Sequence, residues 1–443
     1  MLELAFAFAL GCVLGIISGI IPGINIFVTI LLFFPIIIQW EPATIMFMYI
    51  TLASVNQYFG SVSATIFALP GSTTSIPALK EGHAMFNNGQ GEIAIMHAAL
   101  GSFFASIFAV LMILMCIPFV SVFYQLFNTH VQVAMLVIAS VTIVAFSQNN
   151  FFVSLALFAI GNVLAFVGWH DQYYMSFGTF GIDALYSGIP LLPVMIALFV
   201  FPIFLKNWQI YDRLEFKGVS ASGYIQALKN LWPLRSTLLR SSIIGSLAGF
   251  IPGISWSLST LLAYNLERII QVKRGTYDDN KGNLPSLLAA ESANNAGIYT
   301  AMIPMLFVGV PITASTTLIY NVLQFKGVVL DTAFFRDLYG IVTYGFVLSS
   351  LVGLFIAGKY VNFLRILQGL NIKWFYAVIF CILLVVCYIA GEAQFFGIES
   401  LIILFTLLPF GLFLRKTNNL PLVYGFILHD ITLDSIVRLT YFY

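Results

Sequence analysis

Charged side chains are scarce in this sequence. Lysine, arginine, aspartate and glutamate make up 8% of its 443 residues, whereas hydrophobic residues make up 60%, and the mean hydropathy is +0.97. A soluble globular domain has about a quarter of its residues charged. The chain therefore lacks the polar side chains that would cover a surface facing water. This shortage excludes an ordinary soluble protein and indicates a chain whose solvent is lipid.

Alternating apolar and polar residues, the pattern of a membrane β-barrel, are also missing, because the apolar runs are long and continuous. A spanning helix needs roughly 20 apolar residues, so the chain has room for about ten to fourteen membrane segments. The N-terminus lacks a basic region and a small-residue cleavage site, and we expect its first apolar segment to be retained. The sequence predicts an all-α polytopic membrane protein, whose chain crosses the membrane several times.

Motifs of catalysis and of ATP-driven pumping are absent. The four cysteines lie in apolar runs without a CxxC pair, and the histidines show no metal-ligand spacing. The sequence holds no P-loop, no G-x-S-x-G and no H-E-x-x-H. We therefore expect no enzyme activity and no cofactor, with Na⁺ as a coupling ion the one exception considered below.

A polar stretch over 206–237 divides the chain. It carries more lysine and arginine than aspartate and glutamate, which favours the cytoplasmic side of a membrane. The sequence predicts an N-terminal membrane repeat over 1–205, a polar connecting loop over 206–237 and a C-terminal membrane repeat over 238–443.

An internal repeat supports this division. The pattern GxxxGxIPGI occurs at 15–24 and again at 245–254, once in each half. Proline and glycine break helices, and in a bilayer a break is tolerated mainly where it lines a cavity. The broken-helix motifs centre on Gly19, Pro22, Gly23, Gly249, Pro252 and Gly253. The alternative is that their small residues only let helices pack closely.

A second pair of breaks is rich in hydroxyl groups. Serines and threonines follow Pro70 in the first half and Pro311 in the second. Half-helix ends at such breaks can bind an anion through N–H groups and Na⁺ through oxygens. We expect substrate contacts from Gly71, Ser72, Thr73, Thr74, Ser75, Asn294, Asn295, Thr313, Ser315, Thr316 and Thr317, and a Na⁺ near Pro70, Gly71, Pro311 and Thr313.

Polar residues within apolar segments are further candidates, because such groups are costly in a membrane. Glu291, Asn294 and Asn295 lie in one short segment, and Asn56 with Gln57 is the first-half counterpart. We consider Lys80, Glu291 and Asn56 as charge partners of the substrate or ion. The alternatives are an interhelical hydrogen bond or an interfacial position, and for Lys80 a pair with Glu81 or extension to the lipid headgroups.

These motifs, in this order, resemble the large membrane subunit of the tripartite tricarboxylate transporters, the TctA-like family. The first signature is found at Gly15, Gly19, Ile21, Pro22 and Gly23, then at 58–61, 69–71, 81–83 and 89–90. The second is found at Gly245, Gly249, Ile251, Pro252 and Gly253, then at Tyr264, Glu267, 290–296, Ile303, Pro304, 309–311, Thr316 and Thr317. The chain departs from the family pattern at Ala290, Ile312 and Asn88, where proline, glycine and a basic residue are usual.

The resemblance implies a secondary transporter subunit that imports small carboxylates, of tricarboxylate or dicarboxylate type, by alternating access. It also implies coupling to Na⁺ or H⁺, a periplasmic solute-binding protein that delivers the substrate, and a small membrane subunit as partners. The alternative is a channel or passive pore for small anions without ion coupling. An intramembrane enzyme or a lipid flippase is a third class, for which the sequence offers neither a catalytic pair nor a polar groove.

Overall fold

The computed structural model describes most of the helical segments of the chain. The described residues are 2–20, 26–67, 73–116, 149–170, 175–190, 224–249, 256–278, 280–308, 313–328, 332–359, 372–392 and 397–417, with shorter pieces within 133–144, 193–205 and 419–429 and residue 311. The prolines and glycines Pro22, Gly23, Pro70, Gly71, Pro252 and Gly253 lie outside them, as does Ser72, so the predicted helix breaks at these positions stay predictions.

The chain forms two compact units that each collect distant parts of the sequence. The first consists of Met1–Thr29, Trp40–Tyr124 and Arg213–Leu370, and the second of Ile30–Gln39, Gln125–Asp212 and Asn371–Tyr443. This partition follows packing and cuts across the two halves predicted from the repeat. The halves remain a prediction about internal symmetry.

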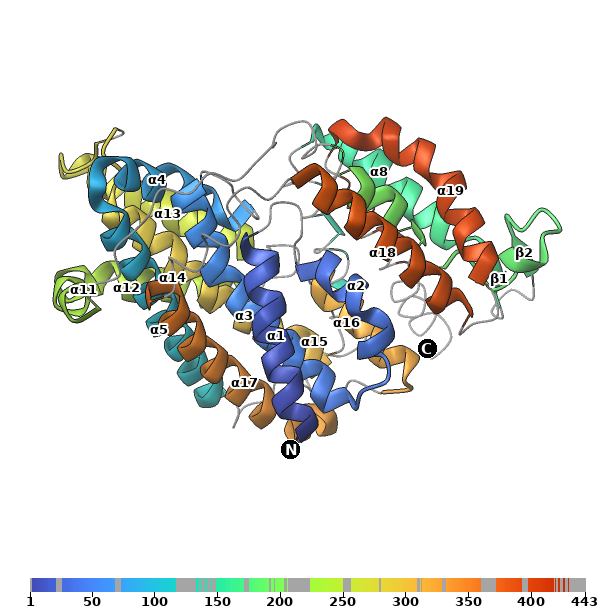
Figure 1. Ribbon diagram of the computed structural model, residues 1–443, viewed down its shortest axis with the longest axis horizontal. Coiled ribbons are helices and arrows are strands. Elements are labelled where there is room, and N and C mark those ends of the chain that lie inside the picture. The colour runs from blue at the N-terminus through green and yellow to red at the C-terminus, as the bar shows by residue number, and fades with distance from the viewer. Residues whose placement is uncertain are drawn as a thin grey trace. The chain divides into compact units, whose positions relative to one another are not determined.

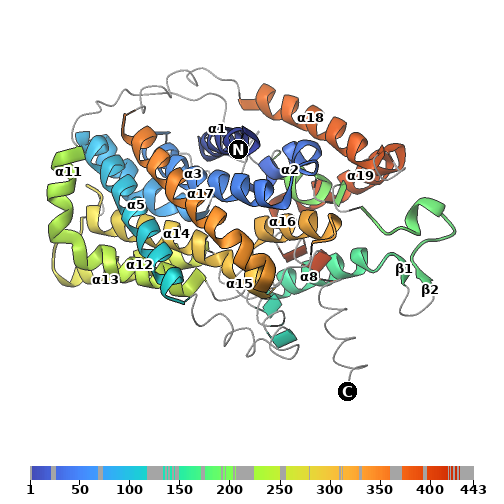
Figure 2. The ribbon, with the colours of Figure 1, turned by 90° about the horizontal axis from the view of Figure 1, so that it is seen from below.

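The first unit is a helical bundle (Figure 1). Its helices are α1 (Leu2–Ile20), α3 (Pro42–Phe67), α4 (His83–Met85), α5 (Gly91–Cys116), α11 (Tyr224–Leu231), α12 (Arg235–Gly249), α13 (Trp256–Lys273), α14 (Leu284–Ala301), α15 (Ile303–Val308), α16 (Ala314–Phe325) and α17 (Thr332–Lys359). A 3₁₀ turn, Thr73–Ser75, and wide π-type turns, Ala78–Gly82 and Phe86–Gln90, join α3 to α5. Helix α5 lies beside α14 and α17, as Figure 2 shows from below.

The second unit holds α8 (Phe151–Ala165), α18 (Ile372–Glu392) and α19 (Gly397–Phe413). After α8 in the sequence, β1 (Gly168–His170) and β2 (Met175–Phe177) form a short antiparallel hairpin, the one sheet among the described residues. Helix α2 (Ile26–Ile37) begins in the first unit and ends in the second. The fold is all-α apart from this hairpin.

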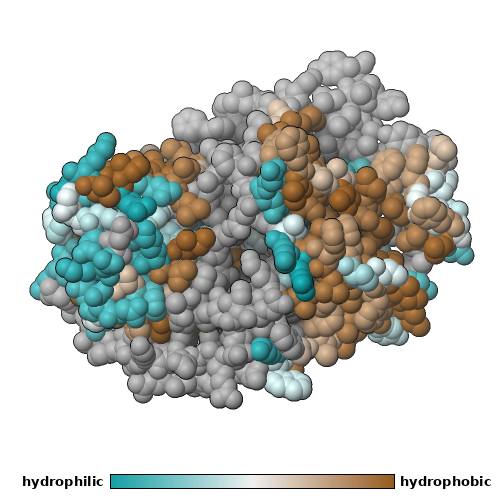
Figure 3. All heavy atoms as spheres, turned by 90° about the horizontal axis from the view of Figure 1, so that it is seen from above, coloured by the Kyte–Doolittle hydropathy of each residue, from teal (hydrophilic) through white to brown (hydrophobic). Residues whose placement is uncertain are grey.

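Lipid is the solvent that this surface fits. Within the described residues, four helical segments are long and apolar enough to cross a membrane: Leu2–Ile20, Ala78–Met115, Leu338–Ala357 and Gly397–Lys416. Figure 3 shows hydrophobic side chains covering the helices of the second unit on one face. In the first unit, hydrophilic side chains gather at the end that carries α4 and α13. The prediction of a polytopic helical membrane protein is confirmed.

The polar connecting stretch predicted over 206–237 is helical in its described part. Residues 224–237 form α11, a 3₁₀ turn and the start of α12. This segment is helical because α11 is amphipathic. Its Ala227 and Leu231 pack in one apolar cluster with Met96, Leu100 and Leu288, while the opposite side of α11 is polar.

Glycines bring two pairs of helices into close contact. A Cβ on Gly15 of α1 would lie 2.8 Å from Cβ of Val55 in α3, and one on Gly19 would lie 2.6 Å from the carbonyl oxygen of Asn56. In the second half, Gly245 of α12 faces the backbone of Ala293 in α14 in the same way. Close packing by small residues, one of the two interpretations of this motif, therefore applies to both glycine stripes.

Candidate functional site

The buried segment of α14 brings polar side chains into the centre of the first unit. Asn283 caps the helix, since its Oδ1 accepts from the backbone N–H of Ser286 at 3.0 Å. Small alanines follow, so neighbouring helices approach closely, and every residue from 286 to 301 is buried. Glu291, Asn294 and Asn295 share one helix face, because their spacing is i, i+3 and i+4. Each is 1% exposed.

A chain of amide hydrogen bonds joins this face to α3 and α1. Asn294 Nδ2 donates to Gln57 Oε1 at 2.9 Å, and Thr74 Oγ1 donates to the same oxygen at 2.9 Å. Gln57 Nε2 donates to Asn56 Oδ1, and Asn56 Nδ2 donates to Ser18 Oγ, both at 2.9 Å. The polar residues predicted from the two halves, Asn56 and Asn294, thus belong to one network with Gln57 at its centre.

This network ends in polar atoms that the protein does not satisfy. Asn294 Oδ1 and both polar atoms of the Asn295 amide are buried and have no hydrogen-bond partner among the described residues. An unsatisfied buried polar group costs about 1–3 kcal/mol, so native structures rarely keep several together without a ligand or water. One helical turn of α14 therefore offers a free donor and free acceptors to a bound molecule.

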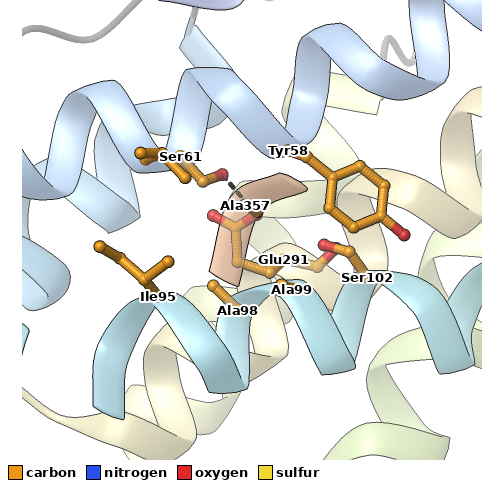
Figure 4. A pocket seen from close by; sticks show the side chains of 9 residues that line it. Tyr58, Ser61, Ile95, Ala98, Ala99, Ser102, Glu291 and Ala357 are labelled. Carbon is orange, nitrogen blue, oxygen red and sulfur yellow. Dashed lines mark hydrogen bonds between the residues drawn. The ribbon is translucent and has the colours of Figure 1, made fainter. Parts of the chain in front are cut away.

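Glu291 points into a small cavity one turn before these amides (Figure 4). Its Oε2 accepts a 2.5 Å hydrogen bond from Ser61 Oγ of α3, and its Oε1 has no hydrogen-bond partner among the described residues. The cavity of about 10 Å³ is lined by Tyr58, Ser61, Val62, Ile95, Ala98, Ala99, Ser102, Glu291 and Ala357. This is room for about one water molecule, so the site is closed in this conformation.

The hydroxyl cluster of the second half serves mainly to start a helix. Thr313 caps α16: its side chain accepts from the backbone N–H of Thr316 at 3.2 Å, and the Thr316 hydroxyl receives the Thr313 N–H at 3.0 Å. Thr317 Oγ1 donates to the carbonyl oxygen of Thr313 at 2.7 Å. Ser315 Oγ instead lies 2.9 Å from the hydroxyl of Tyr49 in α3. The cluster follows buried Pro311 and fixes the N-terminus of α16 inside the unit.

The hydroxyls of the first half meet the amide network at one described residue. Thr74 bonds Gln57, and Ser75 lies against Gly60 of α3, where an added Cβ would come within 2.9 Å of Ser75 Oγ. The side chain of Thr73 lies outside the described residues together with Ser72 and Gly71. The substrate contacts predicted for these three, and the Na⁺ site predicted beside Pro70 and Gly71, stay predictions.

The other carboxylate near the first break, Glu81, has a different role. It is 1% exposed, its Oε1 accepts from the hydroxyls of Tyr264 and Tyr277 at 2.7 Å each, and its Oε2 accepts from the backbone N–H of Asn283 at 2.8 Å. Lys80 is exposed, and its Nζ lies 5.9 Å from the centre of the Tyr277 ring. Glu81 therefore holds the connection between α13 and α14 in place by these three hydrogen bonds. Lys80 contacts the same connection at Tyr277.

Two hydroxyls of this site were not selected from the sequence. Ser61 bonds Glu291 and Ser18 bonds Asn56, yet both serines belong to apolar helices in which single hydroxyls are common. The one available signal was spacing: Gln57 and Ser61 are four residues apart and thus share a face of α3. Which face met α14 could not be read from that spacing.

Comparison with known proteins agrees with the motifs. A family model described as "Tripartite tricarboxylate transporter TctA family" matches residues 5–424. An uncharacterized 52.8 kDa protein in the TAR-I ttuC' 3' region of Agrobacterium vitis is 25% identical over 307 residues, 68% of this chain and 59% of that protein. An uncharacterized protein of Methanocaldococcus jannaschii is 23% identical over 394 residues, 84% of this chain and 83% of that protein. No solved structure matches.

Proposed function

The chain belongs to the tripartite tricarboxylate transporter TctA family, a family of transporters, and on that premise we propose that it is the subunit that carries the substrate across the membrane. The substrate is a small organic carboxylate of tricarboxylate or dicarboxylate type. Import is secondary active, coupled to Na⁺ or H⁺, and proceeds by alternating access in the inner membrane. A periplasmic solute-binding protein delivers the substrate, and a small membrane subunit completes the complex.

One observation carries the proposal: the unsatisfied amides of α14, buried beside the Gln57 network. A hydrocarbon-facing helix gains nothing from such atoms, whereas a substrate path requires them. Asn295 Nδ2 can donate to a carboxylate, and the free oxygens of Asn294 and Asn295 can accept from a hydroxyl or approach a cation. The same arrangement suits a substrate that has both carboxylate and hydroxyl groups.

The closed geometry supports alternating access over an open pore. The cavity beside Glu291 holds about one water molecule, whereas a tricarboxylate is many times larger. Helices of the first unit must therefore separate before a substrate reaches the amides. Broken helices that meet near the middle of the bilayer are a recurring arrangement in such transporters.

Asn295→Ala tests the site directly. Because the Asn295 side chain makes no hydrogen bond to the described protein, its removal should leave folding intact while removing a substrate contact worth about 1.5–3 kcal/mol, or roughly ten- to a hundredfold in uptake efficiency. The measurement is uptake of radiolabelled citrate and succinate into proteoliposomes that contain the complete complex, with and without Na⁺ and pH gradients.

The matched control is Ser292→Ala on the same helix. Ser292 is equally buried, but its hydroxyl donates to the carbonyl oxygen of Leu288 at 2.7 Å and is satisfied within the helix. It should transport like the parent chain. Equal uptake by Asn295→Ala and the parent would show that the amides do not contact the substrate. Uptake that is the same with and without Na⁺ and pH gradients would favour the passive pore.

A further inference from the structure

The Glu291 carboxyl is the one acidic side chain that lines the cavity, and none of the described side chains gives it a cationic partner. Its Oε2 faces the Ser61 hydroxyl and its Oε1 faces the cavity without a hydrogen-bond partner in the described residues. Besides Ser61, the other polar side chains of the lining are Tyr58 and Ser102. An isolated carboxylate in such surroundings is strongly disfavoured, so a cation must neutralise it in this closed state.

Apart from Tyr58, the titratable groups named below on the surrounding helices lie outside the cavity lining. On α12 and α13, Arg240 forms an ion pair with Glu267. On the turn before α4, Glu81 accepts from Tyr264 and Asn283. From α17, Ala357 lines the cavity.

On α5, His97 is outside the lining, and its Nδ1 lies 2.8 Å from the carbonyl oxygen of Ile93. On α3, Tyr58 is the titratable residue of the lining. No described basic side chain reaches Glu291 from these helices.

A proton suits this site better than a metal cation. A hard cation such as Na⁺ requires a shell of several oxygens. Five of the nine lining residues are alkyl: Val62, Ile95, Ala98, Ala99 and Ala357. The free volume accepts one water-sized particle, which is enough to deliver a proton and too little for a hydrated ion.

Ser61 can serve both protonation states of the carboxyl. Its Oγ lies 2.5 Å from Glu291 Oε2 and 3.2 Å from the carbonyl oxygen of Gln57, and a hydroxyl has one hydrogen to give. When Glu291 is ionised, Ser61 donates to Oε2. When a proton has added to Oε2, that O–H donates to Ser61 Oγ, and Ser61 turns its own hydrogen to Gln57. No other bond changes.

We infer that Glu291 with Ser61 forms a proton-binding site on α14 and α3, through which the transport cycle takes up a proton. The inference rests on the proposed transport function and names its coupling ion as H⁺. Protonation neutralises the cavity and lets α3 and α14 close, whereas ionisation attracts water and favours their separation. Gln57 links this event to the amide network, because its backbone carbonyl oxygen accepts from Ser61 and its side chain accepts from Asn294.

The test is infrared difference spectroscopy of the full-length chain in lipid nanodiscs, titrated with acid and base in Na⁺-free buffer. A protonated carboxyl has a C=O stretching band that a carboxylate lacks. Because the chain has 18 aspartates and glutamates, the Glu291 band is isolated by subtracting the Glu291→Gln spectrum from that of the parent chain. We expect this difference to contain a titrating band of a buried carboxyl, and the same subtraction with the control Glu41→Gln, whose side chain is exposed, to lack it. Ser61→Ala keeps the carboxyl and should shift the titration.

The absence of that band from the difference between the parent chain and Glu291→Gln would overturn the inference. So would saturable binding of radioactive Na⁺ that requires Glu291, because the cation would then be Na⁺. Citrate uptake into proteoliposomes, with and without an inward proton gradient, completes the test: the gradient should stimulate the parent and leave Glu291→Gln unstimulated. If the band is present but no carboxylate is transported, the proposed function fails while the proton site stands.

Discussion

Two buried glutamates of the first unit show how the same side chain serves opposite purposes. Glu81 and Glu291 are each 1% exposed. Both carboxylate oxygens of Glu81 accept hydrogen bonds, from two tyrosine hydroxyls and a backbone N–H. Glu291 accepts one, from Ser61, and turns its other oxygen into a cavity.

The difference teaches that burial alone does not mark a carboxylate as a candidate binding group, whereas an unfilled hydrogen-bonding capacity does. A satisfied carboxylate holds its partners in place and resists change. An incompletely satisfied one retains capacity for a ligand, at the expense of stability. The same distinction separates Asn294, bonded to Gln57, from Asn295, which makes no hydrogen bond to the described residues.

The largest expected effect on stability comes from Glu81→Ala. It removes three hydrogen bonds to a buried carboxylate and should lower the free energy of unfolding by about 3–5 kcal/mol. Thermal unfolding of the detergent-solubilised chain measures it. Glu81→Gln should recover part of the loss, because its oxygen can still accept from the Asn283 N–H and tyrosine hydroxyls can accept from its amide. By contrast, Glu291→Gln should change the free energy of unfolding by less than about 1 kcal/mol. Equal losses for Glu81→Gln and Glu291→Gln would contradict the different roles of the two glutamates.

An intermediate effect is expected from Tyr277→Phe, which removes one of the bonds to the Glu81 carboxylate and about 1.5 kcal/mol of stability. Burial, and then the bond to Glu81, raise the pKa of Tyr277 above its usual 10. The folded chain therefore keeps this proton where the unfolded chain releases it, and stability should fall as pH rises above 10. The fall should be shallower in Tyr277→Phe. Identical alkaline slopes of the unfolding temperature would contradict the assignment.

The smallest expected effect on stability is the difference between substitutions at the two amides, Asn294 and Asn295. Asn294→Ala breaks the bond to Gln57 and leaves Gln57 Oε1 with the Thr74 hydroxyl as its remaining partner. The expected loss is about 1 kcal/mol. Asn295→Ala removes no protein hydrogen bond and should be neutral or slightly stabilising. Thermal unfolding of the two variants measures the difference. A greater loss of stability for Asn295→Ala than for Asn294→Ala would show that the Asn295 side chain stabilises the fold.

Much of the candidate site was accessible from the sequence because helical spacing is regular. Glu291, Asn294 and Asn295 had to share a face, and their cost in a membrane marked that face as functional. The hydroxyls after Pro311 were selected because they follow a proline break, and two of the four, Thr313 and Thr316, form the N-cap of α16. Hydroxyls favour both uses, and only the local backbone distinguishes capping from ligand contact.

Residue composition by itself determined that lipid is the solvent and that the fold is helical, because each side chain carries its transfer free energy wherever it lies. Duplicated motifs by themselves indicated the family, and the model of that family confirmed it. Only the tertiary structure decided which buried polar groups meet. Gln57 lies at the centre of the network, both oxygens of Glu81 are hydrogen-bonded and Glu291 accepts one bond from Ser61, because helices distant in sequence were brought within hydrogen-bonding distance. Hydrogen bonds act over about 3 Å, and no regularity along the chain sets distances between helices to that accuracy.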